Sequence, residues 1–263
     1  MSDREAQFRE MAKKRIVLRV PGMDAVSVRR DETYLADEEG ALLMDVYTPA
    51  AASGPSPVVV IVLGFPDPQG IFRRVGWHVS WAQLLATSGI AAVIYGNRRP
   101  AADVHAVLKH IREQAGSLGL DASRIGLLAC SGHGPVALRA TMQDPKLSCG
   151  AFLYTLTMDL DGSHCVANAA KEYGCVDACA GRSAADLPAG TPLLFVRAGR
   201  DQFAGLNDGM DRLVTAAIAR NLPVSIVNHP AGVHAFDLEE DSEVSRGIIR
   251  QVVAFLRLYL EVR

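Results

Sequence analysis

Short and almost uninterrupted apolar runs recur along this sequence, and they constrain its fold more than any other feature. They cover residues 56–64, 90–96, 124–130 and 191–199, and they include the segments VVVIVLG and LLFVRAG. Strands that are buried on both faces have this composition, because helices cover each side of a parallel sheet. The amphipathic stretches between the runs predict crossover helices. The chain is therefore expected to be of the α/β class, with a mostly parallel central sheet and helices on both faces.

Weaker signals extend this pattern toward both ends of the chain. Further strands are predicted around residues 25–35, 41–48, 148–156 and 223–230. Apolar residues recur at helical spacing in the intervening stretches, which are 77–88, 104–118, 134–143, 210–218 and 248–260. No linker or repeat divides the 263 residues, so a single domain over 1–263 is expected.

One segment interrupts the alternation of strands and helices. Residues 157–190 are rich in Ala, Gly, Asp and Cys and show weak periodicity. The segment leaves the carboxyl end of a predicted strand, and this is the edge of an open parallel sheet where ligands bind. It is therefore predicted to be a short lid or substrate loop.

The strand predicted at 124–130 leads directly into the turn SGHG and then into an apolar helix. Strand, sharp turn and helix form the setting of a GxSxG nucleophile elbow, in which the helix N-terminus directs N–H groups at a developing oxyanion. Ala129 supplies the small residue before Ser131, but His133 stands where a glycine is expected. Taken alone, a Ser-Gly pair is more often a simple turn, so the assignment of Ser131 as nucleophile depends on its partners.

A serine hydroxyl becomes a nucleophile when a base takes its proton and a carboxylate orients that base. Asp201 directly follows the predicted strand 191–199, and His234 follows the predicted strand 223–230. Each lies beyond the carboxyl end of a strand, so both are expected at the same sheet edge as Ser131. Separately, Asp201 fits a turn residue and His234 a polar loop residue. Together they predict a triad with Ser131 as nucleophile, His234 as base and Asp201 as orienting acid.

Other residues compete for these roles. Cys130 is a rival nucleophile, but an elbow centred on it would place Leu128 where a small residue is needed, and a packing role is favoured. Asp159 and Asp161 are alternative acids, because they follow the preceding strand. His133 is too close to the turn to be the expected base.

An oxyanion hole needs backbone N–H donors beside the nucleophile. We assign this role to Gly132, which follows the serine, and to Phe65, which begins the loop after the strand 56–64. Candidates for lining the substrate pocket are the aromatic residues Phe72, Trp77, Trp81 and Tyr154. Trp77 and Trp81 stand four residues apart on a predicted helix, and this spacing fits core packing equally well.

The segments LGFPDPQG, RIGLLACSGHG, VRAGRD and AGVHAFD resemble the α/β-hydrolase superfamily, and within it the dienelactone-hydrolase-like and small carboxylesterase branch, over about residues 25–261. The resemblance implies the α/β-hydrolase fold and a serine hydrolase that cleaves a carboxylic ester, lactone or thioester of a small molecule through an acyl-enzyme intermediate. Such acyl transfer needs no cofactor. The spacing of His164, Cys165, Cys175 and Cys179 lacks the paired CxxC of structural zinc sites, so no metal is expected. Ser131 stands where cysteine-dependent dienelactone hydrolases have cysteine, so dienelactone itself is not the expected substrate.

Composition excludes several classes of partner. The 27 Lys and Arg residues nearly balance 29 Asp and Glu residues, leaving a net charge of -2 that does not favour nucleic acid or an anionic membrane. No apolar run is long enough to span a bilayer, and the start lacks the apolar region of a secretory signal. Five irregularly spaced cysteines suit free thiols. A cytoplasmic monomer or homodimer acting on a small-molecule ester is expected.

Two other functions remain open at this point. A non-catalytic member of the same fold would bind a small ligand in the same pocket. A dinucleotide-binding turn would use Gly132, Gly134 and Ala137 as its GxGxxA pattern. Against the second, several strands precede the turn, Pro135 interrupts it, and no acidic residue ends a strand about 20 residues later.

Overall fold

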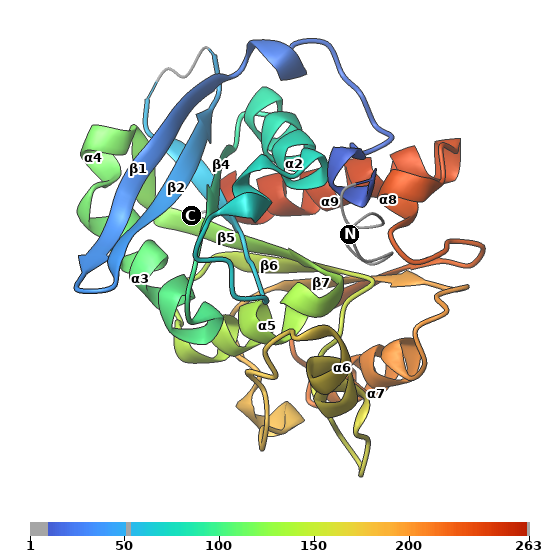
Figure 1. Cartoon of the computed structure of the whole chain (residues 1–263). Helices are drawn as coiled ribbons and strands as arrows, with labels where there is room; N and C mark the ends of the chain where they lie inside the picture. Colours follow the sequence, from blue (N-terminus) through green and yellow to red (C-terminus); the bar gives the residue numbers. More distant parts are fainter. Residues whose placement is uncertain (1–9, 51–53, 262–263) are drawn as a thin grey trace.

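The computed structural model describes residues 10–50 and 54–261, and a sheet of eight strands runs through it in the order β1-β2-β4-β3-β5-β6-β7-β8 (Figure 1). β1 (Ser27–Asp37), β2 (Gly40–Thr48) and β4 (Ala91–Tyr95) pair antiparallel in succession. The remaining strands pair parallel with their neighbours; they are β3 (Ser56–Ile61), β5 (Leu120–Cys130), β6 (Cys149–Leu153), β7 (Leu193–Ala198) and β8 (Val224–His229). The prediction of a mostly parallel α/β sheet is confirmed. The start of the chain up to residue 9, where the sequence lacks the apolar region of a secretory signal, lies outside the described residues.

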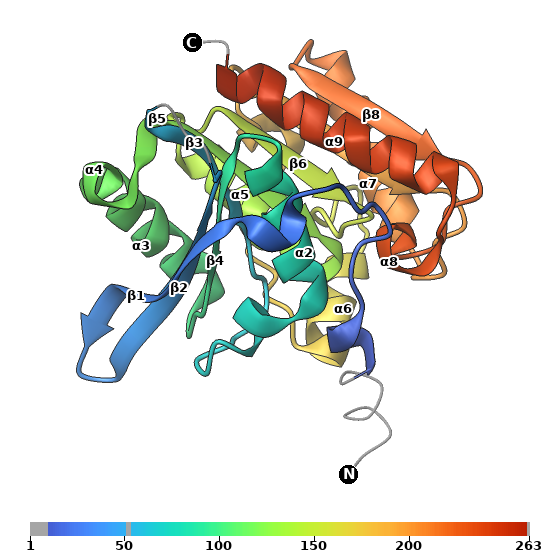
Figure 2. The same cartoon turned by 90° about the horizontal axis from the view of Figure 1, so that it is seen from above.

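Helices cover both faces of this sheet, as the crossover argument requires. α2 (Gly76–Thr87) and α9 (Glu243–Glu261) pack on one face, and α3 (Pro100–Glu113), α5 (Gly134–Gln143) and α7 (Leu206–Ala219) pack on the other (Figures 1 and 2). Shorter helices complete the chain: α4 (Ala115–Leu118), α6 (Cys165–Tyr173), α8 (Phe236–Glu239) and the 3-10 turns η1 (Met23–Ala25), η2 (Ile71–Arg74), η3 (Ser131–His133) and η4 (Ala184–Asp186). All described strands belong to the one sheet, so the chain forms a single domain.

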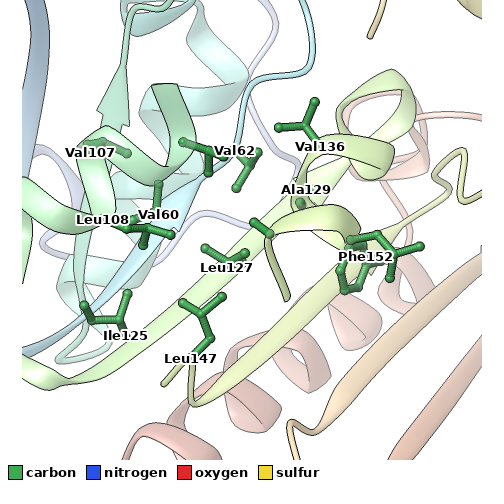
Figure 3. Packing of buried hydrophobic residues seen from close by; sticks show 14 of the residues in the cluster. Val60, Val62, Val107, Leu108, Ile125, Leu127, Ala129, Val136, Leu147 and Phe152 are labelled. Carbon is green, nitrogen blue, oxygen red and sulfur yellow. The ribbon is translucent and has the colours of Figure 1, made fainter. Parts of the chain in front are cut away.

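Successive side chains of the central strands point to opposite faces of the sheet, so the core has two layers. Val60 and Leu127 point to the layer beneath α3 and α5, where Val107 and Val136 meet them (Figure 3). All four side chains are 0% exposed. Their neighbours in sequence, such as Leu128, face the other layer with α2 and α9. Because both faces are covered, the inner segments of these strands, such as 58–61 in β3 and 125–130 in β5, contain no charged or polar side chain.

The structure refines three of the sequence expectations. The helix predicted at 104–118 divides into α3 and α4, and α3 begins at Pro100, whose ring fixes a backbone angle suited to the first turn of a helix. The predicted lid segment 157–190 contains α6 and η4. Ile218, the last residue of the apolar helical spacing over 210–218, is 60% exposed near the end of α7. Within the described ranges, no helix has the length and apolar character needed to cross a membrane.

Candidate active site

Ser131 sits at the turn between β5 and α5 with a backbone φ of 52°, in the left-handed region that side chains other than glycine rarely adopt. Two hydrogen bonds hold the turn: the Ser131 carbonyl accepts from Thr155 Oγ1 at 2.6 Å and from the Leu156 N–H at 3.1 Å. A Cβ on Gly134 would lie 1.8 Å from Thr155 Oγ1. The close packing of α5 on the end of β6 therefore requires glycine at 134, one position later than the usual pattern.

The structure brings Ser131, His234 and Asp201 together in one hydrogen-bonded chain. Ser131 Oγ lies 2.8 Å from His234 Nε2, and His234 Nδ1 lies 2.7 Å from Asp201 Oδ2. The Asp201 side chain is 0% exposed, and its other oxygen accepts the Phe203 N–H at 2.9 Å. A neutral imidazole that donates from Nδ1 to the carboxylate leaves Nε2 to accept the serine proton.

The loops that carry Asp201 and His234 are joined backbone to backbone. The Arg200 N–H donates to the Gly232 carbonyl at 2.8 Å. A Cβ on Gly199 would lie 2.5 Å from the Pro230 carbonyl oxygen, so glycine is needed for the loops to approach this closely. Both loops follow the carboxyl ends of neighbouring parallel strands, β7 and β8, which is why the chain order alone places the two residues together.

The Phe65 and Gly132 backbones lie beside the turn with their N–H groups unused. Among the hydrogen bonds of residues 10–50 and 54–261, neither N–H has an acceptor, although Gly132 is buried. A Cβ on Gly132 would lie 2.8 Å from the Phe65 ring and 3.3 Å from Cys175 Cβ, so these side chains cover the turn. Buried N–H groups are normally paired, and their availability here is typical of an anion-binding position.

The four aromatic candidates lie on the side of the turn that faces α2. Trp77, Trp81 and Tyr154 line a small cavity of about 10 Å³. This volume has room for about one water molecule. Phe72 lies beside this cavity, with its ring centroid 5.7 Å from that of His78 and 5.8 Å from that of His133, which both line it. Tyr154 also supports the histidine, because the ring centroids of Tyr154 and His234 are 5.0 Å apart.

Asp237 joins this region to the histidine loop, and the sequence arguments did not foresee it. Its side chain is 1% exposed and accepts from Trp81 Nε1 at 2.8 Å and from the Tyr154 hydroxyl at 2.7 Å. Burial raises the pKa of Asp237, which these hydrogen bonds partly oppose. The available signal was an acid within the apolar segment HAFDL, three residues after His234.

Two partly exposed aromatic side chains extend outward in contact from the histidine ring. The Phe203 ring centroid lies 4.4 Å from that of His234, and the Tyr173 ring lies 5.6 Å from Phe203. Phe203 is 37% exposed and Tyr173 is 41% exposed. Tyr173 ends α6, so the predicted lid segment contributes directly to these contacts.

The competing residues occupy other positions. Burial raises the pKa of the Cys130 thiol, which disfavours the thiolate needed for attack. Asp159 caps α6 by accepting the Val166 and Ala167 N–H groups at 2.9 and 3.0 Å. Asp161 lies 3.6 Å from Arg212. In the described part of the chain, no group of three or more His, Cys, Asp or Glu side chains is arranged to hold a metal ion.

Solved structures with the same architecture are known, although no protein-family model and no curated protein matches the sequence. A thermostable esterase from Pseudomonas putida is 17% identical with a TM-score of 0.75, covering 100% of this chain and 92% of its own. An α/β-hydrolase enzyme from the metagenome of Lake Arreo, Spain, is 17% identical with a TM-score of 0.75, covering 98% of this chain and 89% of its own. A Klebsiella pneumoniae protein assigned as a candidate dienelactone hydrolase is 19% identical with a TM-score of 0.64, covering 90% of this chain and 100% of its own. The chain has the fold of the α/β-hydrolase superfamily.

Proposed function

We propose that this protein is a serine hydrolase that cleaves a carboxylic ester of a small molecule through an acyl-enzyme intermediate. One observation carries the proposal: Ser131, held at a φ of 52°, lies 2.8 Å from His234, which lies 2.7 Å from the buried Asp201. Esterases among the proteins of similar structure support an ester as the substrate.

The reaction follows from this geometry. Ser131 Oγ attacks the ester carbonyl carbon while its proton passes to His234 Nε2, and Asp201 stabilises the imidazolium that forms. The Phe65 and Gly132 N–H groups bind the oxyanion. The carbonyl–oxygen bond to the alcohol then breaks as Nε2 returns the proton to the leaving oxygen. Water, activated by His234, attacks the acyl-enzyme, releases the acid and restores the serine.

The border of the site favours an apolar substrate of modest size. The exposed Phe203 ring lies beside the histidine, and the exposed Tyr173 ring lies beside Phe203. The predicted lid segment contributes Val166 and Cys175 to a small apolar cluster, in which they pack against Leu156 and Leu206. An ester with an apolar alcohol or acyl group would bury its carbon atoms against these side chains.

The geometry disfavours the two alternative functions. A dinucleotide-binding turn must let a pyrophosphate approach its glycines, but the Gly134 and Gly132 α-carbons face Thr155 and the Phe65 ring. A purely ligand-binding protein would not need an aligned nucleophile, base and acid.

Labelling and turnover test the proposal together. A fluorophosphonate should add once to the protein, on Ser131, and a short-chain nitrophenyl ester should be hydrolysed. Ser131→Ala should lower kcat/KM by about 10³-fold or more with the fold retained, because only substrate binding and oxyanion stabilisation remain. Cys130→Ala is the matched control and should keep most of the activity. A folded protein with neither adduct nor turnover would refute catalysis, and loss of activity only in Cys130→Ala would move the nucleophile to the thiol.

A further inference from the structure

His133 departs from the small residue expected after a nucleophilic serine, and its side chain is directed into the protein interior. It is 2% exposed, and its ring centroid lies 5.1 Å from Phe65, 5.8 Å from Phe72 and 6.1 Å from Trp77. Burial lowers the pKa of His133 to about 3, so the imidazole is neutral and has one acceptor nitrogen and one donor nitrogen.

The acceptor nitrogen binds the strand end that precedes the oxyanion loop. His133 Nδ1 accepts the Gly64 N–H at 2.7 Å, which leaves the ring proton on Nε2. The Gly64 carbonyl accepts the Val176 N–H at 2.8 Å. Both polar groups of this residue are therefore held, one by the elbow and one by the lid segment.

These contacts determine the direction of the Phe65 N–H. The Gly64 carbonyl and the Phe65 N–H belong to one peptide unit, and none of the described peptide bonds is cis. In a trans peptide the N–H points opposite to the carbonyl, so a carbonyl directed at Val176 turns the Phe65 N–H the other way. The Gly132 N–H is fixed similarly, because the Ser131 carbonyl of its peptide unit is bonded to Thr155 and Leu156.

Gly64 is also in direct backbone contact with the elbow. A Cβ at this position would lie 2.5 Å from the Gly132 carbonyl oxygen and 2.7 Å from the His133 Cα. The two chain segments that carry the N–H donors thus touch at Gly64, and the hydrogen bond from Gly64 to His133 fixes their relative position. A small shift at this contact would change the separation of the two donors.

We infer that His133 is a positioning residue, whose Nδ1 holds Gly64 so that the Phe65 and Gly132 N–H groups converge on the oxyanion of the substrate. The inference rests on the proposed ester hydrolysis. It assigns His133 no proton transfer and no contact with the substrate. Its effect is on the transition state, because the negative charge that the two donors bind develops only there.

Two substitutions separate the hydrogen bond from the packing of the ring. His133→Asn keeps an acceptor, Oδ1, at the same number of bonds from the main chain as Nδ1, but it loses the ring. His133→Phe keeps a ring of similar shape among Phe65, Phe72 and Trp77 but offers only carbon to Gly64. If packing alone mattered, the Phe variant would be the better enzyme.

We expect His133→Phe to lower kcat by about 10- to 100-fold with KM changed by less than about threefold, since loss of a whole oxyanion donor costs about 10² to 10³ in kcat. His133→Asn should restore kcat to within about fivefold of the wild type. Inhibition by a trifluoromethyl ketone, whose serine adduct carries an oxyanion, should weaken in the Phe variant by about the same factor as kcat falls.

The experiment measures kcat and KM for a nitrophenyl ester, the inhibition constant of the ketone and fluorophosphonate labelling of Ser131 in the full chain. Circular dichroism and a thermal melt verify folding, and His133→Leu replaces the Phe variant if that protein does not fold. Equal kcat in the acceptor-free and Asn variants, or a higher kcat in the Phe variant, would overturn the inference while wild-type activity upheld the proposed function. A wild type that neither labels nor turns over would overturn both.

Discussion

Burial determines the charge of His133, and this has a consequence for stability that is separate from catalysis. Burial lowers the pKa of His133 in the folded chain to about 3 from the ordinary 6.5. A histidine with a lowered folded pKa contributes stability that is fully present above pH 6.5 and is lost as the pH falls toward 3, because only the unfolded chain takes up the proton in that window. Between pH 7.5 and pH 5 the loss should be about 2 kcal/mol.

Replacing the ring by one that cannot titrate tests this linkage. Measured with denaturant, the free energy of unfolding should fall by about 2 kcal/mol more in the wild type than in His133→Phe between pH 7.5 and pH 5. Other titrating groups, including the buried His78, are present in both proteins and largely cancel. An unchanged difference would mean that folded His133 accepts a proton as readily as the unfolded chain.

At the scale of elements, the contact between α5 and the end of β6 holds the elbow in place. Gly134→Ala would put a Cβ 1.8 Å from Thr155 Oγ1 and 2.2 Å from the Leu156 carbonyl oxygen, and the carbonyl is backbone that cannot rotate away. We expect a loss of about 2 kcal/mol or more in the free energy of unfolding. Gly209→Ala in α7 is the control, since its nearest contact would be an ordinary 3.6 Å.

Thermal and denaturant unfolding of the two alanine variants give the comparison. Gly209→Ala should be neutral or stabilising by up to about 1 kcal/mol, because alanine favours a helix interior over glycine. Similar effects of both changes would contradict the packing argument, since helix propensity would then outweigh the contact with Thr155.

The sequence could predict the features that depend on local pattern and chain order. The apolar run of β5 and its sharp turn predicted Ser131 as nucleophile, and the ends of β7 and β8 predicted Asp201 and His234 as its partners. The structure brings the three side chains within hydrogen-bonding distance, because neighbouring parallel strands deliver their following loops to one edge. The acceptor role of His133 was not predictable, since it depends on Gly64, which is 69 residues away in the sequence.

The contacts of Asp237 were hidden from the sequence for the same reason. Its partner Trp81 lies 156 residues earlier, and no local pattern relates the two. The helical spacing of Trp77 and Trp81 predicted that Trp81 faces inward. The spacing could not show whether its side chain packs in the core or lines a pocket. Its indole N–H binds Asp237 while its ring lines the small cavity behind the elbow.

Across the whole molecule, a buried ion cluster joins the antiparallel edge of the sheet to the segment that leads into α2. Asp45 of β2 is 0% exposed and pairs with Arg73 at 2.6 Å, Arg74 at 3.2 Å and Arg30 at 3.5 Å. Arg73 lies in η2, directly after Phe72, whose ring contacts His133. The β1–β2 hairpin and the surroundings of the elbow are thereby linked by charge as well as by packing.

Asp45→Asn should lower the free energy of unfolding by about 3 kcal/mol, because the buried Arg73 guanidinium would lose its buried counter-charge and keep only the half-exposed Asp31 carboxylate at 2.9 Å. Glu10→Gln is the control and should change it by less than about 0.5 kcal/mol, since the Glu10–Lys13 pair is exposed.

The two tryptophans both lie in α2, so their fluorescence reports the region beside the elbow, whereas far-ultraviolet circular dichroism reports all the helices. If the hairpin edge and the elbow region unfold as one cooperative unit, the transitions seen by both probes in Asp45→Asn will shift together and coincide. Separation of the two transitions would show instead that the hairpin edge and the elbow region unfold as independent units.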